Sequence, residues 1–214
     1  MSLFEKLVYL IPGLVVALTF HEYAHALVAY KRGDDTAYRA GRLTLNPLVH
    51  LDPIGALLLL FVGFGWAKPV PVNPMNLANP KRDMVWVSLA GPISNMIQAL
   101  ILALIIRVIF IMNVNIGNFI ITLRFAFSIN LVLAVFNLIP LAPLDGHKIV
   151  SGLLPYNKSI QFEEATRRGP MILMGILILG SVTNINILGM IIEPWVHLWS
   201  IILLGSQITM LMGL

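Results

Sequence analysis

The stretch "ALTFHEYAHALVAY" (residues 17–30) places two histidines and a glutamate inside a run that otherwise has the composition of a membrane helix. His21 and His25 are four residues apart, so on a helix their side chains lie on one face and can share one metal ion. Glu22 lies about 100° round the helix from His21, where it can act as a base without being a ligand. An ionisable side chain at the bilayer centre costs about 2.5–3.5 kcal/mol on translocon scales. We therefore interpret the stretch as a metal site inside a membrane helix.

The composition of the whole chain is that of an integral membrane protein. Of its 214 residues, 58% are hydrophobic and only 11% are charged, and the mean hydropathy is +0.87. Soluble domains have about 25% charged residues. The net charge of +4 does not indicate nucleic acid, because multi-pass membrane proteins carry surplus Lys and Arg on their cytoplasmic loops. The chain has no cysteine, so any metal site must be built from histidines and carboxylates.

Five apolar windows are long enough, at about 20 residues each, to cross a bilayer. They lie near residues 7–30, 84–112, 118–140, 170–191 and 195–213. We predict an all-α polytopic membrane protein with one domain over residues 1–214. Its catalytic core is expected at about 7–155, and a C-terminal helical pair at about 170–213.

A shorter apolar segment, "IGALLLLFVGFGW" (54–66), has only 13 residues and favours a re-entrant dip over a full crossing. Basic residues flank it on both sides, which supports a dip because both flanks then lie on one side of the membrane. The alternative is a sixth span, so the prediction is five to six transmembrane helices. Closely spaced prolines in "WAKPVPVNPMNLANP" (66–80) favour an extended backbone, either a connector or a strand edge for another chain. Residues of about 40–80 are therefore predicted to form a short re-entrant or extended membrane-associated segment.

The distribution of Lys and Arg also predicts the orientation. The loop after the third window is basic, whereas the connection at 113–117 has no charged residue. Because Lys and Arg gather on cytoplasmic loops, we place the basic loops on the cytoplasmic side. His25 precedes Lys31 by six residues, which on a helix is about 9 Å. The metal site is therefore expected towards the cytoplasmic face.

The pattern H-E-x-x-H on a helix is the signature of hydrolytic zinc sites, which usually have three protein ligands and one open position. Eight of the ten acidic residues lie outside or at the edges of the predicted spans, which leaves Glu22 and Asp145. Asp145 lies in "FNLIPLAPLDGHKIV" (136–150) at the end of the third span, at the depth expected for His25. Asp145 is therefore the candidate third ligand, and His147 is the alternative. The remaining two histidines, His50 and His197, are interpreted as structural.

Two motifs together resemble a known family. HEYAH in a membrane helix and "NLIPLAPLDG" (137–146) resemble the site-2 protease family of intramembrane zinc metalloproteases, peptidase family M50. The stretches "GRLTLNPLVHLDPIG" (41–55), "GWAKPVPVNP" (65–74) and "AGPISN" (90–95) are similar to its bacterial branch. The chain looks like a minimal bacterial-type member, with room for neither a PDZ nor a CBS domain.

The resemblance implies one zinc ion (Zn2+) per chain, held by His21, His25 and Asp145, with Glu22 as the catalytic base. It implies hydrolysis of peptide bonds in or near the transmembrane segments of other membrane proteins, such as a membrane-tethered regulator. It also implies residence in a bacterial cytoplasmic (inner) membrane, with the lipid bilayer as the surrounding partner and no nucleic acid bound.

Asn95 and Asn137 are candidates for contacting the substrate backbone or the oxyanion; the alternative for both is hydrogen bonding between packed helices. Gly91 is small enough for its helix to approach the metal helix closely. A different function is also open, a non-proteolytic metal-binding membrane protein that transports or senses a cation. Glu22 beside the first histidine argues against it, since transport needs no base there, and an inactive scaffold is disfavoured because all four catalytic positions are present.

Overall fold

The computed structural model of the chain describes residues 3–55, 58, 65–183 and 185–214. The described helices are α1 (Leu3–Lys31), α2 (Thr36–Arg39), η1 (Pro47–Val49), η2 (Pro74–Asn76), α4 (Pro80–Ile111), α5 (Phe119–Asn137), α6 (Asp145–Leu153), α7 (Tyr156–Thr166), α8 (Gly169–Thr183), α9 (Ile187–Leu204) and α10 (Ser206–Met212). Within these ranges the extended pairing is limited to one isolated bridge between Leu51 and Ala67. The predicted all-α class is therefore confirmed.

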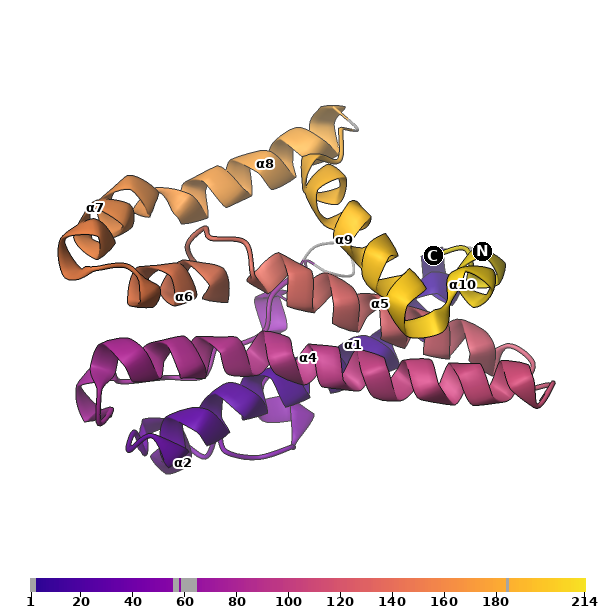
Figure 1. Cartoon of the computed structure of the whole chain (residues 1–214), viewed down its shortest axis with the longest axis horizontal. Coiled ribbons are helices and arrows are strands. Elements are labelled where there is room, and N and C mark those ends of the chain that lie inside the picture. The colour runs from indigo at the N-terminus through magenta and orange to yellow at the C-terminus, as the bar shows by residue number, and fades with distance from the viewer. Residues whose placement is uncertain (1–2, 56–57, 59–64, 184) are drawn as a thin grey trace.

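Helix α4 is the centre of the molecule, and it packs against α1, α5, α6 and α9. Figure 1 shows α1, α4 and α5 running side by side, with α8 and α9 arching over them. Asn79 caps the start of α4, because its side chain accepts a hydrogen bond from the Arg82 amide, and Pro80 stands at the first helical position, where a missing N–H is tolerated. The helix then runs for 32 residues, long enough to cross a bilayer and reach into the water beyond it.

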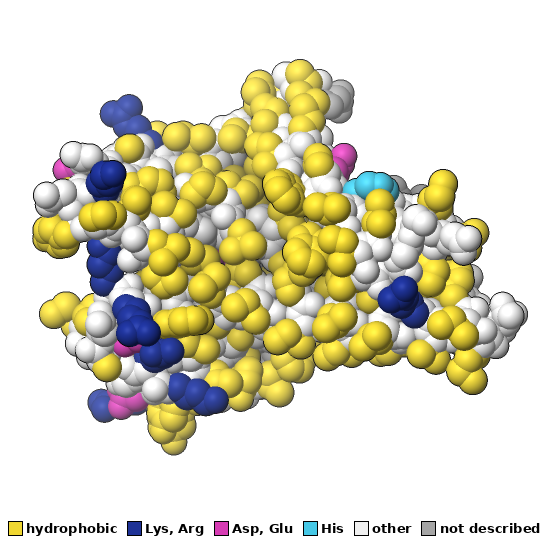
Figure 2. Space-filling view, in the orientation of Figure 1, with side chains coloured by type: hydrophobic (Ala, Val, Ile, Leu, Met, Phe, Trp, Pro, Cys, Tyr) yellow, Lys and Arg dark blue, Asp and Glu magenta, His cyan; other side chains and the backbone are white. Residues whose placement is uncertain are grey.

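Four helices in the described part of the chain are long and apolar enough to cross a membrane: Leu7–Lys31, Pro80–Ile111, Phe119–Asn137 and Ile187–Leu204. The first three confirm the first three predicted spans. Apolar side chains cover the middle of the molecule, and Lys and Arg gather mainly at the end formed by α2, the start of α4 and the α6–α7 pair (Figures 1 and 2). The chain is thus a multi-pass membrane protein with one basic end.

The largest apolar core lies away from that basic end. Small residues of α4, among them Ala99 and Ala103, let α5 approach closely, and Phe127 and Leu131 of α5 are fully buried against them. Leu204 of α9 and Met212 of α10 close the cluster. This packing joins α4, α5 and the C-terminal helices into one body. The polar site forms elsewhere, between the C-terminal half of α1 and the N-terminal half of α4.

The predicted boundary between the last two spans, at residues 191–195, is wrong. Helix α8 ends at Thr183 and α9 begins at Ile187, and Pro194 lies inside α9. Asn186 sets the start of α9, because its side chain accepts a hydrogen bond of 2.8 Å from the Gly189 amide, as helix-capping residues do. With 15 residues, α8 is shorter than the roughly 20 needed for a straight crossing.

The prediction of a dip at 54–66 falls largely outside the described residues. The proline-rich stretch after it is described, and residues 65–73 contain no helix, as their prolines predicted. We call residues 65–73 the extended segment. It begins beside the Leu51 to Ala67 bridge and ends at η2, and no described contact tests whether another chain pairs with it.

Asp34 ties the end of α1 to the end of the extended segment. Its side chain is fully buried, and its carboxylate accepts hydrogen bonds from the Thr36 amide (3.0 Å), the Asn76 side chain (3.0 Å) and the Asn73 amide (2.7 Å). Burial alone would raise the pKa of this carboxyl, but the hydrogen bonds from Thr36, Asn73 and Asn76 outweigh burial and lower it. The ionised carboxylate therefore holds three chain segments together.

Replacing Asp34 by alanine is expected to lower the free energy of unfolding by about 3 kcal/mol, because buried donors lose a charged acceptor. Asp35→Ala is the matched control, since Asp35 forms an exposed ion pair with Arg39, and such pairs contribute about 0.5 kcal/mol or less. Thermal unfolding in detergent, followed by circular dichroism, measures both. Equal losses in the two variants would contradict the assigned role of Asp34.

Candidate metal centre

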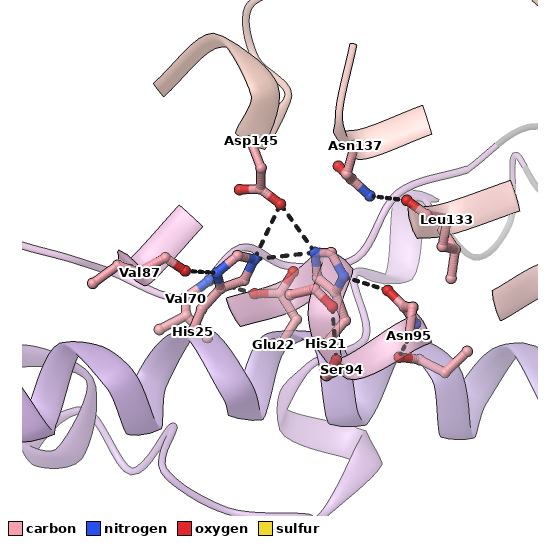
Figure 3. Close-up of polar contacts among 12 residues, drawn as sticks. His21, Glu22, His25, Val70, Val87, Ser94, Asn95, Leu133, Asn137 and Asp145 are labelled. Carbon is pink, nitrogen blue, oxygen red and sulfur yellow. Dashed lines mark hydrogen bonds and ion pairs between the residues drawn. The ribbon is translucent and has the colours of Figure 1, made fainter. Parts of the chain in front are cut away.

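Helix α1 places His21 and His25 on one face, one turn apart (Figure 3). The two rings meet edge to face, with centroids 4.7 Å apart and an angle of 82° between their planes. Their Nε2 atoms are 3.0 Å apart, and both side chains are buried. Two imidazole nitrogens that point at each other inside a protein need a cation or a proton between them. The prediction that the two histidines share one face is confirmed.

Asp145 is the first residue of α6, and the turn at residues 138–144 between α5 and α6 brings it back towards α1. A side chain at Gly146 would overlap the carbonyl oxygens of Leu138 and Ile139, so this return requires glycine. The carboxylate oxygen Oδ2 of Asp145 lies 3.3 Å from His21 Nε2 and 3.2 Å from His25 Nε2 (Figure 3). Three ligand atoms from two distant parts of the chain thus form one small triangle.

The triangle fits a zinc ion. Zinc bonds of 2.0–2.1 Å in a tetrahedral site imply ligand atoms roughly 3.3–3.4 Å apart, close to the 3.0, 3.2 and 3.3 Å found here. Within the described part of the chain, the buried Asp145 Oδ2 has no hydrogen-bond partner, which suits an oxygen that coordinates a metal. His21, His25 and Asp145 together could hold one ion and would leave one position of a tetrahedron open.

The outer nitrogens of both rings are held by α4. His25 Nδ1 lies 2.7 Å from the carbonyl oxygen of Val87, and His21 Nδ1 lies 2.6 Å from Oδ1 of Asn95. Because both partners are acceptors, each Nδ1 carries the proton and each Nε2 presents its lone pair to the metal position. Such outer hydrogen bonds fix ring orientation and raise ligand basicity.

Asn95 is placed as an orienting residue and not as a substrate contact. It is fully buried, and its Nδ2 donates to the carbonyl of Ala17 (3.2 Å) and to Oδ1 of Asn130 (2.9 Å). Because its Oδ1 also accepts from His21, the amide group of Asn95 has all its partners inside the helix bundle. This matches the alternative role given above, hydrogen bonding between packed helices. Asn130, which the sequence analysis did not single out, extends this chain of hydrogen bonds to α5.

Gly91 of α4 lies directly against the rings of His21 and His25. A Cβ atom at this position would lie 2.5 Å from His21 Cε1 and 2.6 Å from His21 Nε2, and closer still to His25 Nε2. The two imidazole rings therefore occupy the space that any side chain at residue 91 would need. The prediction that Gly91 permits close approach of the metal helix is confirmed, and the contact proves to be with the metal ligands themselves.

A cleft of about 390 Å³ opens beside the ligands, between α1, α5, the extended segment and α8. His21, Glu22 and Asn137 line it, and its walls are mostly apolar, with Leu133 and Phe136 from α5 and Leu173, Met174 and Leu177 from α8. Glu22 is buried, and its Oε2 accepts a hydrogen bond of 2.8 Å from the Val70 amide of the extended segment. The cleft thus brings a carboxylate, a metal-ligand group and an apolar surface together.

The other histidines lie outside the ligand group. His147 Nε2 is 2.8 Å from Thr166 Oγ1, and its ring stacks on Phe162, which links α6 to α7. Burial lowers the pKa of His147, although the charge of Glu163 opposes this. His50 Nε2 lies 2.8 Å from the Thr44 carbonyl oxygen. Among the described residues the structure therefore offers Asp145, and not His147, as the third ligand.

The sequence of the chain is similar to those of known proteins. The sequence profile of peptidase family M50 matches residues 105–180. The protein named "Putative zinc metalloprotease YwhC" of Bacillus subtilis is 46% identical over 166 residues, which cover 75% of this chain and 76% of YwhC. The chain belongs to peptidase family M50. The resemblance seen in the sequence motifs is thereby confirmed.

More distant relatives also align with the chain. The protein named "Putative zinc metalloprotease MJ0611" of Methanocaldococcus jannaschii is 31% identical over 150 residues, which cover 69% of this chain and 72% of that protein. "Putative zinc metalloprotease Rip2" of Mycobacterium tuberculosis is 32% identical over 148 residues, which cover 65% of this chain and 55% of Rip2. No solved structure matches the chain significantly.

Gly91→Ala is expected to reduce bound zinc to below about one tenth of the wild-type content, because the new methyl group overlaps both ligand rings and their surroundings are close-packed. Gly175→Ala is the matched control, since that helical glycine has open space around it. Elemental analysis of the purified variants measures zinc per chain, and circular dichroism checks helix content. Full zinc content in Gly91→Ala would contradict the close contact of Gly91 with the two ligand rings.

Asn95→Ala is expected to weaken zinc binding about 10- to 100-fold, the usual effect of losing an outer-shell partner. Asn95→Asp keeps an acceptor for His21 but loses the donor to Ala17 and Asn130, so it should restore part of the affinity. Asn137→Ala serves as the control, because Asn137 donates to the Leu133 carbonyl and does not touch a ligand. Competition with a chelator measures all three, and equal weakening in Asn95→Ala and Asn137→Ala would exclude the orienting role.

Proposed function

We propose that this member of family M50 is an intramembrane zinc metalloprotease that hydrolyses peptide bonds in or near the transmembrane segments of other membrane proteins. The observation that carries the proposal is the convergence of His21, His25 and Asp145 on one point, with the carboxylate of Glu22 on the next residue of the same helix. Relatives named as zinc metalloproteases support the choice of both the metal and the reaction.

The residues divide the chemistry between them. A zinc ion held by His21, His25 and Asp145 would supply Lewis acidity and would lower the pKa of a water molecule to about 7. Glu22 acts as the general base that takes the proton of the attacking water, and it then delivers a proton to the amine that leaves. Val70 holds one carboxylate oxygen of Glu22, and the burial of this side chain keeps the proton from being lost to bulk water.

The cleft determines what kind of substrate can reach Glu22. Its walls are mostly apolar, which suits the side chains of a transmembrane segment. A helical peptide has its carbonyls bonded and shielded, so the substrate must be unwound where it is cut. Asn137 lines the cleft, and we assign it a contact with the extended substrate backbone. A single-span, membrane-tethered regulator is the class of substrate proposed.

The proposed location is a bacterial cytoplasmic membrane, with the metal centre towards the cytoplasm. The gathering of Lys and Arg at the end formed by α2, the start of α4 and α6–α7 supports this orientation (Figure 2), because positive residues are retained on the cytoplasmic side. Asp145 begins α6 and therefore lies near this end. A reporter fused within residues 156–166 would read out the side directly.

The test of the function pairs metal content with cleavage. Wild type and Glu22→Gln are both expected to contain about one zinc per chain, while cleavage of single-span membrane substrates falls by at least about 100-fold in Glu22→Gln, the range for loss of a general base. Glu164→Gln, an exposed change on α7, is the matched control and should cleave normally.

Other outcomes would redirect the assignment. Equal cleavage by wild type and Glu22→Gln would remove Glu22 as the base. Bound zinc together with no cleavage of any substrate in a broad panel would favour the alternative, a membrane protein that transports or senses a cation. Zinc uptake into vesicles containing the purified protein then tests transport.

A further inference from the structure

Arg42 has an environment that its position in the sequence does not suggest. By sequence it is one of several loop cations that set the orientation of the chain, and such residues normally face water. In the structure it is 6% exposed. Its guanidinium donates from Nη2 to the carbonyl oxygen of Lys68 (2.6 Å) and from Nη1 to the carbonyl oxygen of Pro69 (3.3 Å). A buried guanidinium that binds two successive backbone carbonyls fixes the local course of that backbone.

The residue that follows these two carbonyls touches the proposed base. The amide of Val70 donates to Glu22 Oε2 at 2.8 Å. Val70 stands between Pro69 and Pro71, neither of which has an amide hydrogen, so Val70 carries the one N–H group of this tripeptide. Residues 68, 69 and 70 therefore make three successive contacts: two carbonyl oxygens accept from Arg42, and one amide donates to Glu22. The position of the amide is therefore set by the grip of Arg42.

The hydrogen bonds on either side of residues 68–70 leave this short stretch dependent on Arg42. Before it, the Lys68 amide donates to the carbonyl oxygen of His50 (2.9 Å). After it, the Asn73 amide donates to Asp34 (2.7 Å). The prolines between these two points cannot donate to a partner, so without Arg42 the stretch at 68–70 would lose two of its described polar contacts. The bond to Val70 holds one oxygen of Glu22 and leaves the other, Oε1, to take up a proton.

We propose that Arg42 is a positioning residue for Glu22, acting through the backbone of residues 68–70. This inference rests on the proposed proteolytic function, in which Glu22 is the base. Arg42 does not touch the metal ligands or the reacting atoms. It holds the Val70 amide where that amide fixes the rotation of the Glu22 carboxylate, and misplacement of a catalytic group by about 1 Å can lower a rate by about 100-fold.

Two variants break the linkage between Arg42 and Glu22, one at each end. Arg42→Met keeps an unbranched apolar stem and removes the donors of the side chain. Val70→Pro removes the amide hydrogen and puts a ring carbon in its place, in a stretch that already carries prolines on both sides. Arg42→Lys should restore part of the effect, because an ammonium can reach one carbonyl but not hold two in a fork. Arg39→Gln is the matched control, since Arg39 is exposed and pairs with Asp35.

The expected result is a fall of at least about tenfold in kcat for Arg42→Met and for Val70→Pro, with KM and zinc per chain within about twofold of wild type. The double variant should be no worse than the poorer single one, because the two changes break successive contacts of one linkage from Arg42 to Glu22. Arg39→Gln should match wild type. A rise in KM with unchanged kcat, additive losses in the double variant, or loss of zinc in both single variants would overturn the proposal.

A second readout does not depend on cleavage. Hydrogen exchange of the Val70 amide should be slow in the wild type, and faster in Arg42→Met and in Glu22→Ala but not in Arg39→Gln. If the protein cleaves nothing while this exchange pattern holds, the proteolytic function fails and the Arg42 to Glu22 linkage stands. If the exchange of Val70 is unchanged in Arg42→Met, the linkage itself is wrong, whatever the activity.

Discussion

Two imidazole rings inside a membrane helix require a partner for every nitrogen, and this requirement organises the rest of the molecule. The outer nitrogens of His21 and His25 find theirs on α4, which can come close enough only because residue 91 is glycine. The inner nitrogens face each other and Asp145. Since an unpaired polar group is expensive in an apolar surrounding, the register between α1 and α4 is fixed by polar contacts, and apolar packing fills the space around them.

The remaining parts of the site are brought to this helix pair by irregular backbone. The turn after α5 and the bare backbone at Gly146 bring in Asp145, and the extended segment brings the Val70 amide to Glu22. Backbone groups that are not in a helix need other partners at membrane depth, and here Arg42, Asp34 and the ligand-bearing helix provide them. The two non-helical segments are therefore the ones that bring Asp145 and the Val70 amide to the site.

The sequence predicted the group of three ligands more completely than the network around it. HEYAH is informative because helical spacing alone puts two histidines on one face, and the scarcity of intramembrane carboxylates leads to Asp145. Asn130 and Arg42 were missed for different reasons. Asn130 has a role only through Asn95, a contact between two helices that no local pattern encodes, and Arg42 has the same sequence signature as any loop cation. The break before α9 was misplaced because the apolar windows continue past residue 186, where the cap at Asn186 starts a new helix.

The origin of the third ligand has a consequence for how the protein is made. Asp145 follows His25 in the chain only after α4 and α5, two complete membrane helices. A nascent chain that has inserted α1 and α4 already has both histidines and the partners of their outer nitrogens, but it lacks the carboxylate. The metal centre is therefore completed late, after the helices that enclose it have entered the bilayer. An unfinished chain holds Glu22 without the full ligand set beside it, so biogenesis separates membrane insertion from the acquisition of activity.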